Sequence, residues 1–187
     1  MSPCRLGTFL ALLVASATMA GGAPLPERWT HAGQALERKA SAPVHYAGIF
    51  HVYDAALYGP AGVASRALAE VRNPACLVIE YRMTVSAERL REAADKVLSR
   101  QQADLAPLAA RIARLHAAYR DVAEGDRFAL CHAPGLGTTL DLNGVRQVTV
   151  EGDDFARAYF GIWLGEEPIA PPLREAVRDG EDRLDRA

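Results

Sequence analysis

A run rich in apolar, β-branched and aromatic residues lies between Val44 and Tyr58. It contains no proline and one glycine, a composition that is typical of a buried strand. Alternation along a strand would place Tyr53 on one face and Asp54 on the other, and neither face is purely polar. The pattern therefore predicts one long central strand over residues 44–58, covered by other elements on both sides.

Four shorter strands are predicted where apolar and polar residues alternate or where an apolar run ends at turn residues. Residues 76–85 alternate with period two and lead directly into a helical pattern. The pair Asn143-Gly144 separates the last two strands and is a strong hairpin signal. The four predicted strands are 76–85, 127–132, 138–142 and 145–150.

Helical periodicity predicts three main helices and a short C-terminal one. Ser86 is expected to cap the first helix, and Asp153 or Asp154 the third. The third helix carries Phe155, Tyr159 and Trp163 on one apolar stripe, which is expected to be core or the wall of a cleft. The second predicted helix covers about 105–119 and the last one 173–177.

The remaining segments are predicted to be connections. Residues 24–43 are expected to form an entry segment that is exposed around Glu37, Arg38 and Lys39. Residues 60–74 begin at a Gly-Pro break and are expected to link two strands. Gly165 is expected to close the third helix in the left-handed conformation.

The order strands, helices, strands, helices indicates an α+β fold with a largely antiparallel sheet. The 187 residues suit one domain, half of them are hydrophobic, and the formal net charge is -2 with a pI of about 6.2. No basic stripe or arginine-rich run is present, so nucleic-acid binding is not expected.

Residues 1–23 have the pattern of a secretory signal peptide. Arg5 precedes an apolar run that ends in small residues before Pro24. An uncleaved membrane anchor is the alternative, although the run is short for a bilayer. We therefore expect a periplasmic or secreted protein without a membrane span after cleavage, consisting of a domain over 24–178 and a charged tail over 179–187.

Removal of the signal peptide would leave two cysteines, Cys76 and Cys131, both in predicted strands. An exported protein with two thiols can join them in a disulfide. The pair can meet only if the two strands are neighbours. The sequence leaves both a disulfide and two buried free thiols open.

The central run also contains the main candidates for chemistry. A buried Asp54 needs a partner or a raised pKa, and such groups often lie at functional sites, but a structural hydrogen bond is the more common explanation of such a group. His45 and His51 would share a strand face but stand too far apart for a small metal site, and no metal site is predicted. His116 is expected on a helix surface and His132 at a strand end.

Three segments resemble the bacterial exported chalcone isomerase-like domain family. They are FHVYDAALYGPAG, EGDRFALCHAPGLGTTLDLNG and GDDFARAYFGIWLGEEPIAPPLREAV. The resemblance implies an open-faced β-sandwich, in which helices are layered on one face of a large antiparallel sheet. It also implies a cleft between sheet and helices that holds a flat phenolic or a fatty acid.

The residues that the resemblance assigns to catalysis match poorly here. Tyr53 stands about where the family's central-strand threonine would be, and the early-strand arginine falls on Ser41 or His45. Arg38 is the one arginine nearby, in the charged run. Tyr119 is the one tyrosine in the middle helices, which contain no asparagine.

The resemblance and the residues together favour a non-catalytic binding protein for a lipophilic or aromatic small molecule, without a cofactor. The expected ligand-binding residues are Tyr53, Asp54, His51, Tyr159 and Trp163. An isomerase of the chalcone isomerase type is the alternative, with Tyr53 and His45 as catalytic candidates. The cyclisation needs a cation or strong donors to stabilise its oxyanion, and a neutral histidine is a weak substitute.

Overall fold

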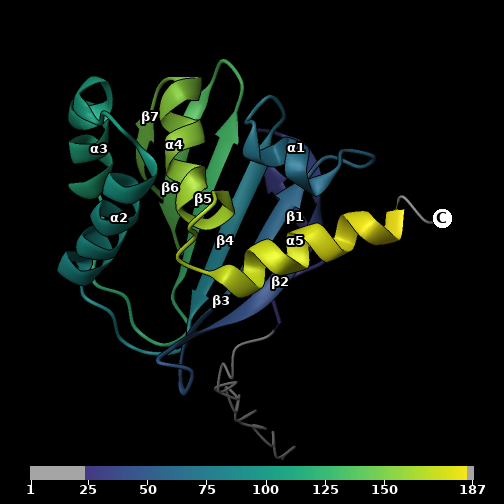
Figure 1. The fold of residues 1–187 in the computed structure, drawn as a ribbon, viewed down its shortest axis with the longest axis horizontal. Helices are drawn as coiled ribbons and strands as arrows, with labels where there is room; N and C mark the ends of the chain where they lie inside the picture. Colours follow the sequence, from purple (N-terminus) through teal and green to yellow (C-terminus); the bar gives the residue numbers. More distant parts are fainter. Residues whose placement is uncertain (1–23, 185–187) are drawn as a thin grey trace, which may run out of the picture.

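The structure is a computed structural model that describes residues 24–184, so the predicted signal peptide lies outside the described residues. This part of the chain forms a seven-stranded sheet and a set of helices (Figure 1). The strands are β1 (Arg28–His31), β2 (Gln34–Tyr46), β3 (Phe50–Gly59), β4 (Ala75–Tyr81), β5 (Arg127–Ala133), β6 (Gly137–Leu142) and β7 (Val145–Val150). The helices are α1 (Ser65–Ala69), α2 (Ala87–Gln101), the 3-10 helix η1 (Ala106–Leu108), α3 (Ala109–His116), α4 (Asp153–Leu164) and α5 (Pro171–Leu184).

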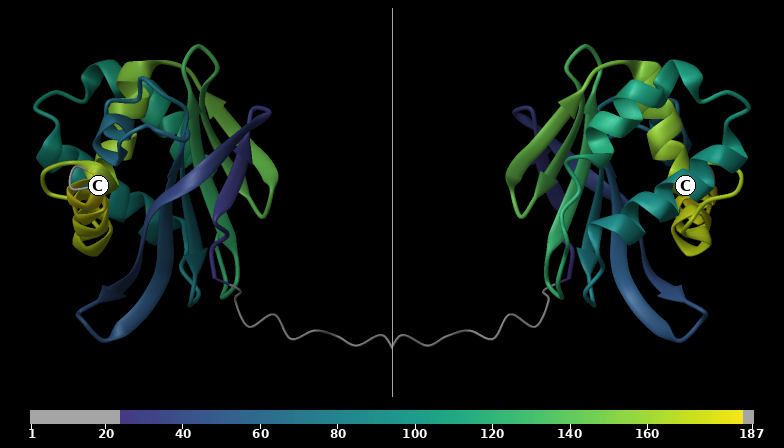
Figure 2. Two further views of the ribbon diagram at one scale, coloured as in Figure 1. Left: turned by 90° about the vertical axis from the view of Figure 1, so that its right-hand side faces the viewer. Right: turned by 90° about the vertical axis from the view of Figure 1, so that its left-hand side faces the viewer.

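Every strand pairs antiparallel with its neighbours in the sequence, so the sheet order is β1 to β7. The sheet is strongly curled, and the helices lie together on one of its faces (Figure 2). The predicted α+β architecture, an antiparallel sheet with helices on one face, is confirmed.

The predicted central strand over residues 44–58 is wrong in one respect: it is a hairpin. Ala47 and Gly48 both have positive φ, and the chain reverses there between β2 and β3. Across the turn, Tyr46 pairs with Phe50 and His45 with His51. The sequence hides the turn because alanine rarely adopts the left-handed conformation. The predicted alternation holds within β3, where Tyr53 faces the helices and Asp54 the opposite side.

The predicted entry segment over 24–43 is also corrected, because it contains β1 and most of β2. Ala40, Ala42 and Val44 alternate toward the helices and are buried in the main core. Arg38 points to the opposite face, where it lies across from Tyr58. The charged run therefore belongs to a strand rather than to a loop.

Other boundaries shift for local reasons. The strand predicted to end at Val85 leaves the sheet after Tyr81, and the helix predicted over 105–119 is the short η1 followed by α3. Gly152, at φ 100°, is the N-cap of α4, so Asp153 and Asp154 lie in its first turn. Gly165 has a φ of -72°, which is not left-handed.

Two further segments are more helical than predicted. The connection over 60–74 contains α1, and the C-terminal helix α5 runs well beyond the predicted 173–177. Part of the predicted charged tail over 179–187 is therefore helical, while 185–187 lie outside the described residues. None of the helices in the described part of the chain combines the length and apolarity that crossing a bilayer requires.

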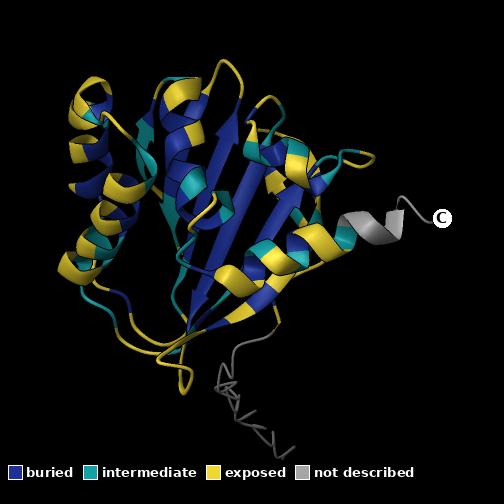
Figure 3. Ribbon diagram, in the orientation of Figure 1, coloured by how far each residue is buried: buried dark blue, intermediate teal, exposed yellow. Residues whose placement is uncertain are grey.

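The central strands of the sheet consist mostly of buried residues (Figure 3). The curled sheet separates two apolar cores. The main core lies between the sheet and the helices, and includes Leu57, Leu77 and Phe160. The smaller core lies on the other face, where Leu25 and Trp29 pack with Tyr58 and Val78. Both faces of the central strands are thus covered, as predicted.

A disulfide lies in the smaller core. Cys76 of β4 and Cys131 of β5 are directly opposite each other, and their sulfur atoms are bonded. His31 of β1 lies against this pair, and these three residues are the one cluster of metal-ligand side chains among the residues whose side chains the structure describes. The two sulfur atoms are bonded to each other and are not available as thiolate ligands.

Candidate functional site

A cavity of about 230 Å³ lies between the sheet and the helices α2 and α4. It exists because α2 presents two small side chains, Ala93 and Ala94, toward the sheet. Ser86 fixes the start of this helix, since its Oγ accepts a hydrogen bond from the Arg89 backbone N–H at 3.3 Å. The wall is formed mostly by aliphatic and aromatic side chains, among them Leu77, Ile79, Leu90, Phe128, Leu130, Leu140, Ile162, Trp163 and Ile169.

Three tyrosines supply the polar groups inside the cavity: Tyr53, Tyr81 and Tyr119. Burial raises the pKa of Tyr53 and of Tyr119 to about 12 and that of Tyr81 well above its usual value. All three hydroxyls are therefore neutral at physiological pH and act as hydrogen-bond donors or acceptors without charge.

The three hydroxyls differ in their partners. Tyr53 accepts a hydrogen bond from the indole N–H of Trp163 at 3.3 Å, which leaves its own proton for another acceptor. The hydroxyl of Tyr81 has no hydrogen bond to any of the described residues. A ligand oxygen in the cavity would therefore meet unused donors.

Tyr119 belongs to a chain of polar side chains that leads from the cavity to the protein surface. Its hydroxyl lies 2.9 Å from that of Tyr159, which lies 3.1 Å from His116 Nε2. On the other side of the ring, His116 Nδ1 is 3.6 Å from the exposed carboxylate of Asp95. Burial lowers the pKa of His116, and Asp95 opposes that shift. The chain is thus neutral except at its outer end.

The mouth of the cavity lies at the end of the sheet where β2 turns into β3. The exposed side chains along the cavity lining are those of His45, Tyr46 and Arg89. Arg89 stands in the first turn of α2, where the helix dipole disfavours a cation. No ion pair joins it to a carboxylate within the described residues. The mouth is therefore positively charged and suited to an anionic group.

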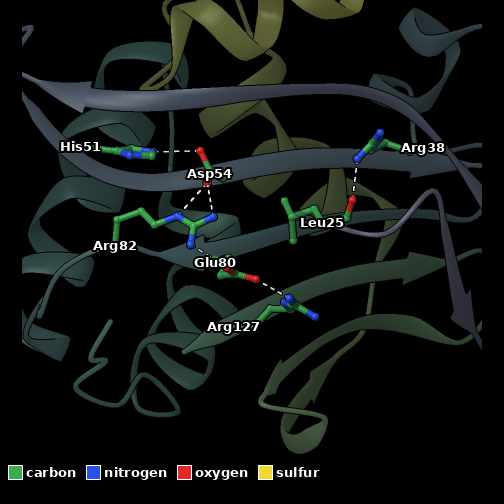
Figure 4. Close-up of polar contacts among 7 residues, drawn as sticks. All are labelled: Leu25, Arg38, His51, Asp54, Glu80, Arg82 and Arg127. Carbon is green, nitrogen blue, oxygen red and sulfur yellow. Dashed lines mark hydrogen bonds and ion pairs between the residues drawn. The ribbon is translucent and has the colours of Figure 1, made fainter. Parts of the chain in front are cut away.

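The opposite face of the sheet carries a chain of ion pairs (Figure 4). Asp54 accepts hydrogen bonds from Arg82 at 2.7 and 2.5 Å, and its other oxygen lies 2.8 Å from His51 Nε2. Arg82 continues to Glu80 at 2.9 Å, and Glu80 also binds Arg127. The contact with Asp54 raises the pKa of Arg82. Each charge in this chain has a partner of opposite sign.

The structure brings only part of the predicted site together. Tyr53, Trp163 and His45 line the cavity, whereas Tyr159 lies behind Tyr119 and reaches the cavity through it.

Asp54 and His51 lie outside the cavity lining, and this corrects the prediction that they share a site with Tyr53. Successive residues of a strand point to opposite faces, so Asp54 faces away from the helices. His51 is bonded to Asp54 and, across the hairpin, its ring stacks on that of His45 with centroids 4.8 Å apart. Asp54 therefore has the structural partner that the alternative interpretation required.

Two histidines are more buried than the sequence indicated. His116, predicted on a helix surface, is buried against Tyr159, because α3 packs over the sheet next to α4. His132 lies near the end of β5 as predicted and is fully buried there. Burial lowers the pKa of both.

A comparison with protein families agrees with this geometry. The family model described as chalcone isomerase-like matches residues 17–177. The chain belongs to the chalcone isomerase-like family. The crystal structure of a fatty-acid binding protein from Arabidopsis thaliana is similar in fold, with a TM-score of 0.62 at 13% identity over 86% of this chain and 100% of that one. No curated protein matches the sequence.

Compared with the residues expected from the chalcone isomerase-like family, the cation at this site comes from a different element. Ser41 pairs with Ala56 and, like Arg38, points away from the cavity, while His45 lies at the mouth. The arginine that borders the cavity is Arg89, on a helix rather than on an early strand. Sequence reasoning missed it, and the available signal was an arginine in the first turn of a capped helix, where acidic residues are preferred.

Proposed function

We propose that this protein binds a lipophilic small molecule with an acidic or hydrogen-bond-accepting head group, a fatty acid or a phenolic, in the cavity between its sheet and helices. The observation that carries the proposal is an apolar cavity with tyrosine hydroxyls inside and, at its mouth, Arg89, which forms no ion pair with the described residues. The plant protein of similar fold is a fatty-acid binding protein, which supports the same class of ligand.

The size of the cavity narrows the choice of ligand. An apolar cavity of about 150 Å³ holds one benzene molecule. A cavity of about 230 Å³ is half as large again. It would enclose about nine non-hydrogen atoms, which suits a medium-chain acid or a single-ring phenolic acid.

If the ligand is an acid, its carboxylate is expected at the mouth of the cavity. A carboxylate buried among apolar side chains loses its hydration, whereas at the mouth it keeps water and meets Arg89. The tail then fills the space beside Ala93 and Ala94. A ligand with an uncharged carbonyl or phenol can instead reach the hydroxyls of Tyr53, Tyr81 and Tyr119.

Calorimetry with decanoic acid and its methyl ester tests the proposal. Ala94→Phe fills the cavity and is expected to abolish binding of both ligands. Arg89→Ala is expected to weaken the acid about threefold to tenfold and to leave the ester unchanged, since a partly exposed charged hydrogen bond is worth about 1 kcal/mol. Arg100→Ala, on the same helix but outside the cavity lining, is the matched control and leaves both ligands unchanged.

Binding that survives Ala94→Phe would place the ligand elsewhere, and no binding of either ligand would contradict the proposal. Native mass spectrometry of the purified protein adds an unbiased readout. A co-purifying acid or phenolic that is absent from Ala94→Phe supports the same conclusion.

An isomerase is the second candidate, and the observation that favours it is the hydrogen-bonded chain from Tyr119 through Tyr159 to His116, with the Asp95 carboxylate 3.6 Å from the histidine ring. Such a chain can move a proton between the cavity and the surface. The donors inside the cavity are neutral hydroxyls, and this argues against the stabilisation of a full oxyanion. Turnover of a chalcone above the uncatalysed rate, lost in Tyr119→Phe, would establish the enzyme.

We also propose that the protein is exported and works in a periplasm or outside the cell. The pattern of residues 1–23 supports a signal peptide, and a disulfide in the core agrees with an oxidising compartment. Mass spectrometry of the protein from the producing cell decides this. We expect the mass of a chain that begins near Pro24. A mass that corresponds to the full chain, with residues 1–23 included, would contradict cleavage.

A further inference from the structure

Large apolar side chains are exposed mainly at one end of the sheet. Six such residues are exposed in the described part of the chain, and five of them lie at the end where β2 turns into β3, β4 ends and β7 begins. The five are Tyr46, Ile49, Phe50, Met83 and Val145, and the sixth, at the opposite end, is Leu136. An uneven distribution of this kind marks an interaction surface.

Three of these residues form one cluster, Tyr46, Ile49 and Phe50, which we call the tip patch. They occupy the turn of the β2–β3 hairpin, which projects beyond the rest of the fold (Figure 2). Ile49 is 75% exposed and Phe50 56%. Neither residue belongs to an apolar core. Folding therefore leaves these side chains in water.

The tip patch borders the mouth of the cavity. Tyr46 belongs to both, and its neighbour His45 also lines the cavity. The loop after β4 is fastened beside the hairpin, because the Arg82 N–H donates to the Val52 carbonyl at 2.8 Å. This places the exposed Met83 on the same side. A molecule that enters the cavity passes beside the tip patch.

The charges on the hairpin that carries the tip patch are compatible with a lipid surface. Residues 44–53 contain two histidines and no acidic residue. The first carboxylate after them, Asp54, is neutralised by Arg82. Arg89 at the mouth is a further cation. An anionic or zwitterionic bilayer would meet no opposing charge on this hairpin.

The shape of the tip patch also suits a bilayer better than a protein. A stable protein interface buries about 800 Å² on each partner, which is more than three side chains on a narrow turn provide. A projecting apolar turn can instead enter the boundary between head groups and acyl chains, about 5–10 Å deep. Tyrosine is favoured at that depth because its ring is apolar and its hydroxyl stays hydrated.

We infer that the tip patch docks the protein on the surface of a lipid bilayer, with the cavity mouth facing the lipid. A lipophilic ligand then moves between bilayer and cavity without crossing water. This use of the docked state rests on the proposed function, whereas the docking itself rests only on the hairpin.

Vesicle co-sedimentation tests the inference, with the protein purified from the producing cell and its N-terminus defined by mass spectrometry. The vesicles contain phosphatidylcholine, with or without phosphatidylglycerol. The double variant Ile49→Ser/Phe50→Ser is expected to lower the partition coefficient about tenfold or more, since two large apolar side chains lose their burial. Leu136→Ser is the matched control, an equally exposed residue at the opposite end, and leaves partition unchanged.

A second measurement reports the depth of the hairpin directly. Ile49→Trp is expected to show a blue-shifted emission on vesicles and quenching by brominated lipids, whereas Leu136→Trp shows neither. Vesicle binding that is equal in the wild-type protein and the double variant would overturn the inference. The same conclusion follows if the wild-type protein stays in the supernatant.

Docking and ligand binding can fail separately. The double variant is expected to bind decanoic acid in solution like the wild-type protein, because neither residue lines the cavity. Loss of vesicle binding with unchanged acid binding supports the inference. Vesicle binding by the wild-type protein together with no acid binding would refute the proposed function and leave the docking surface in place.

Discussion

On the helix-covered face of the sheet the polar groups inside the cavity are tyrosine hydroxyls, whereas the opposite face carries a chain of paired carboxylates and guanidinium groups. Tyr53 and Asp54 are consecutive in β3 and belong to different faces. The hydroxyl of Tyr53 remains neutral beside an apolar cavity, and its one hydrogen-bond partner within the described residues is the indole N–H of Trp163. Asp54 is held by Arg82 and His51 at the edge of solvent.

The difference follows from the cost of removing charge from water. A charge in an apolar cavity needs a buried partner and several hydrogen bonds, and an unpaired one costs several kcal/mol. Neutral hydroxyls can stay partly unused and remain available to a ligand. The polar groups of the two faces therefore have different roles. The ion pairs of the opposite face bind protein groups and stabilise the fold, whereas the hydroxyls of the helix-covered face are available to a ligand.

The largest effect on stability is expected from the disulfide on the opposite face. Cys76→Ala/Cys131→Ala removes a link between residues that are 55 apart in sequence. The unfolded chain gains conformational freedom, and the free energy of unfolding is expected to fall by about 4 kcal/mol. Urea denaturation of the wild-type and double-variant proteins measures it.

The affinity of the same cysteine variant for decanoic acid tests whether the cavity depends on the opposite face. The folded fraction of the cysteine variant is expected to bind the acid as the wild-type protein does. A parallel loss of affinity would show that the cavity depends on the opposite face, and the comparison between the faces would break down.

A smaller effect is expected from Glu80, which is 1% exposed and lies between Arg82 and Arg127. Glu80→Ala leaves both guanidinium groups without this partner, and the expected loss is about 3 kcal/mol, near the lower end for a broken buried pair because both arginines reach solvent. Thermal or urea unfolding measures it.

The matched control is Glu167→Ala, which breaks the exposed pair with Arg100. An exposed pair contributes less than about 1 kcal/mol, so this variant is expected to unfold nearly as the wild-type protein does. If the two variants lost the same free energy of unfolding, the buried ion pairs of Glu80 would contribute no more stability than an exposed pair.

The smallest effect concerns pH and the helix-covered face. Burial lowers the pKa of His116, so the folded protein holds this ring neutral while the unfolded chain binds a proton below about pH 6.5. The stability that the neutral ring preserves is therefore present above that pH and is lost as the pH falls toward the folded pKa. The loss cannot exceed about 1.4 kcal/mol per pH unit for one histidine.

Urea denaturation between pH 7 and pH 5 checks this expectation, at pH values chosen within the histidine range. His116→Gln is expected to reduce the pH dependence, and the remainder belongs to His31 and His132, whose pKa values burial also lowers. An unchanged pH dependence in His116→Gln would show that the ring takes up its proton in the folded state.

Patterns local in the chain determined much of the fold. Period-two alternation predicted β4 and the faces of β3, Asn143-Gly144 predicted the last hairpin, and Ser86 predicted the start of α2, all of which the structure contains. These signals work because strand pleating, turn geometry and helix capping depend on residues close in sequence. The sequence resemblance also indicated the family and its architecture.

The tertiary structure decided the site. A turn at Ala47 and Gly48 carries no strong local signal, and it alone divides the predicted central strand and places His45 at the cavity mouth. The pairing of Asp54 with Arg82 and the approach of Arg89 to the cavity depend on how β3, β4 and α2 pack. Contacts between residues distant in sequence follow from packing rather than from local preference. The sequence alone could therefore place Tyr53 and Asp54 on opposite faces of a strand but could not assign the two faces separate functions.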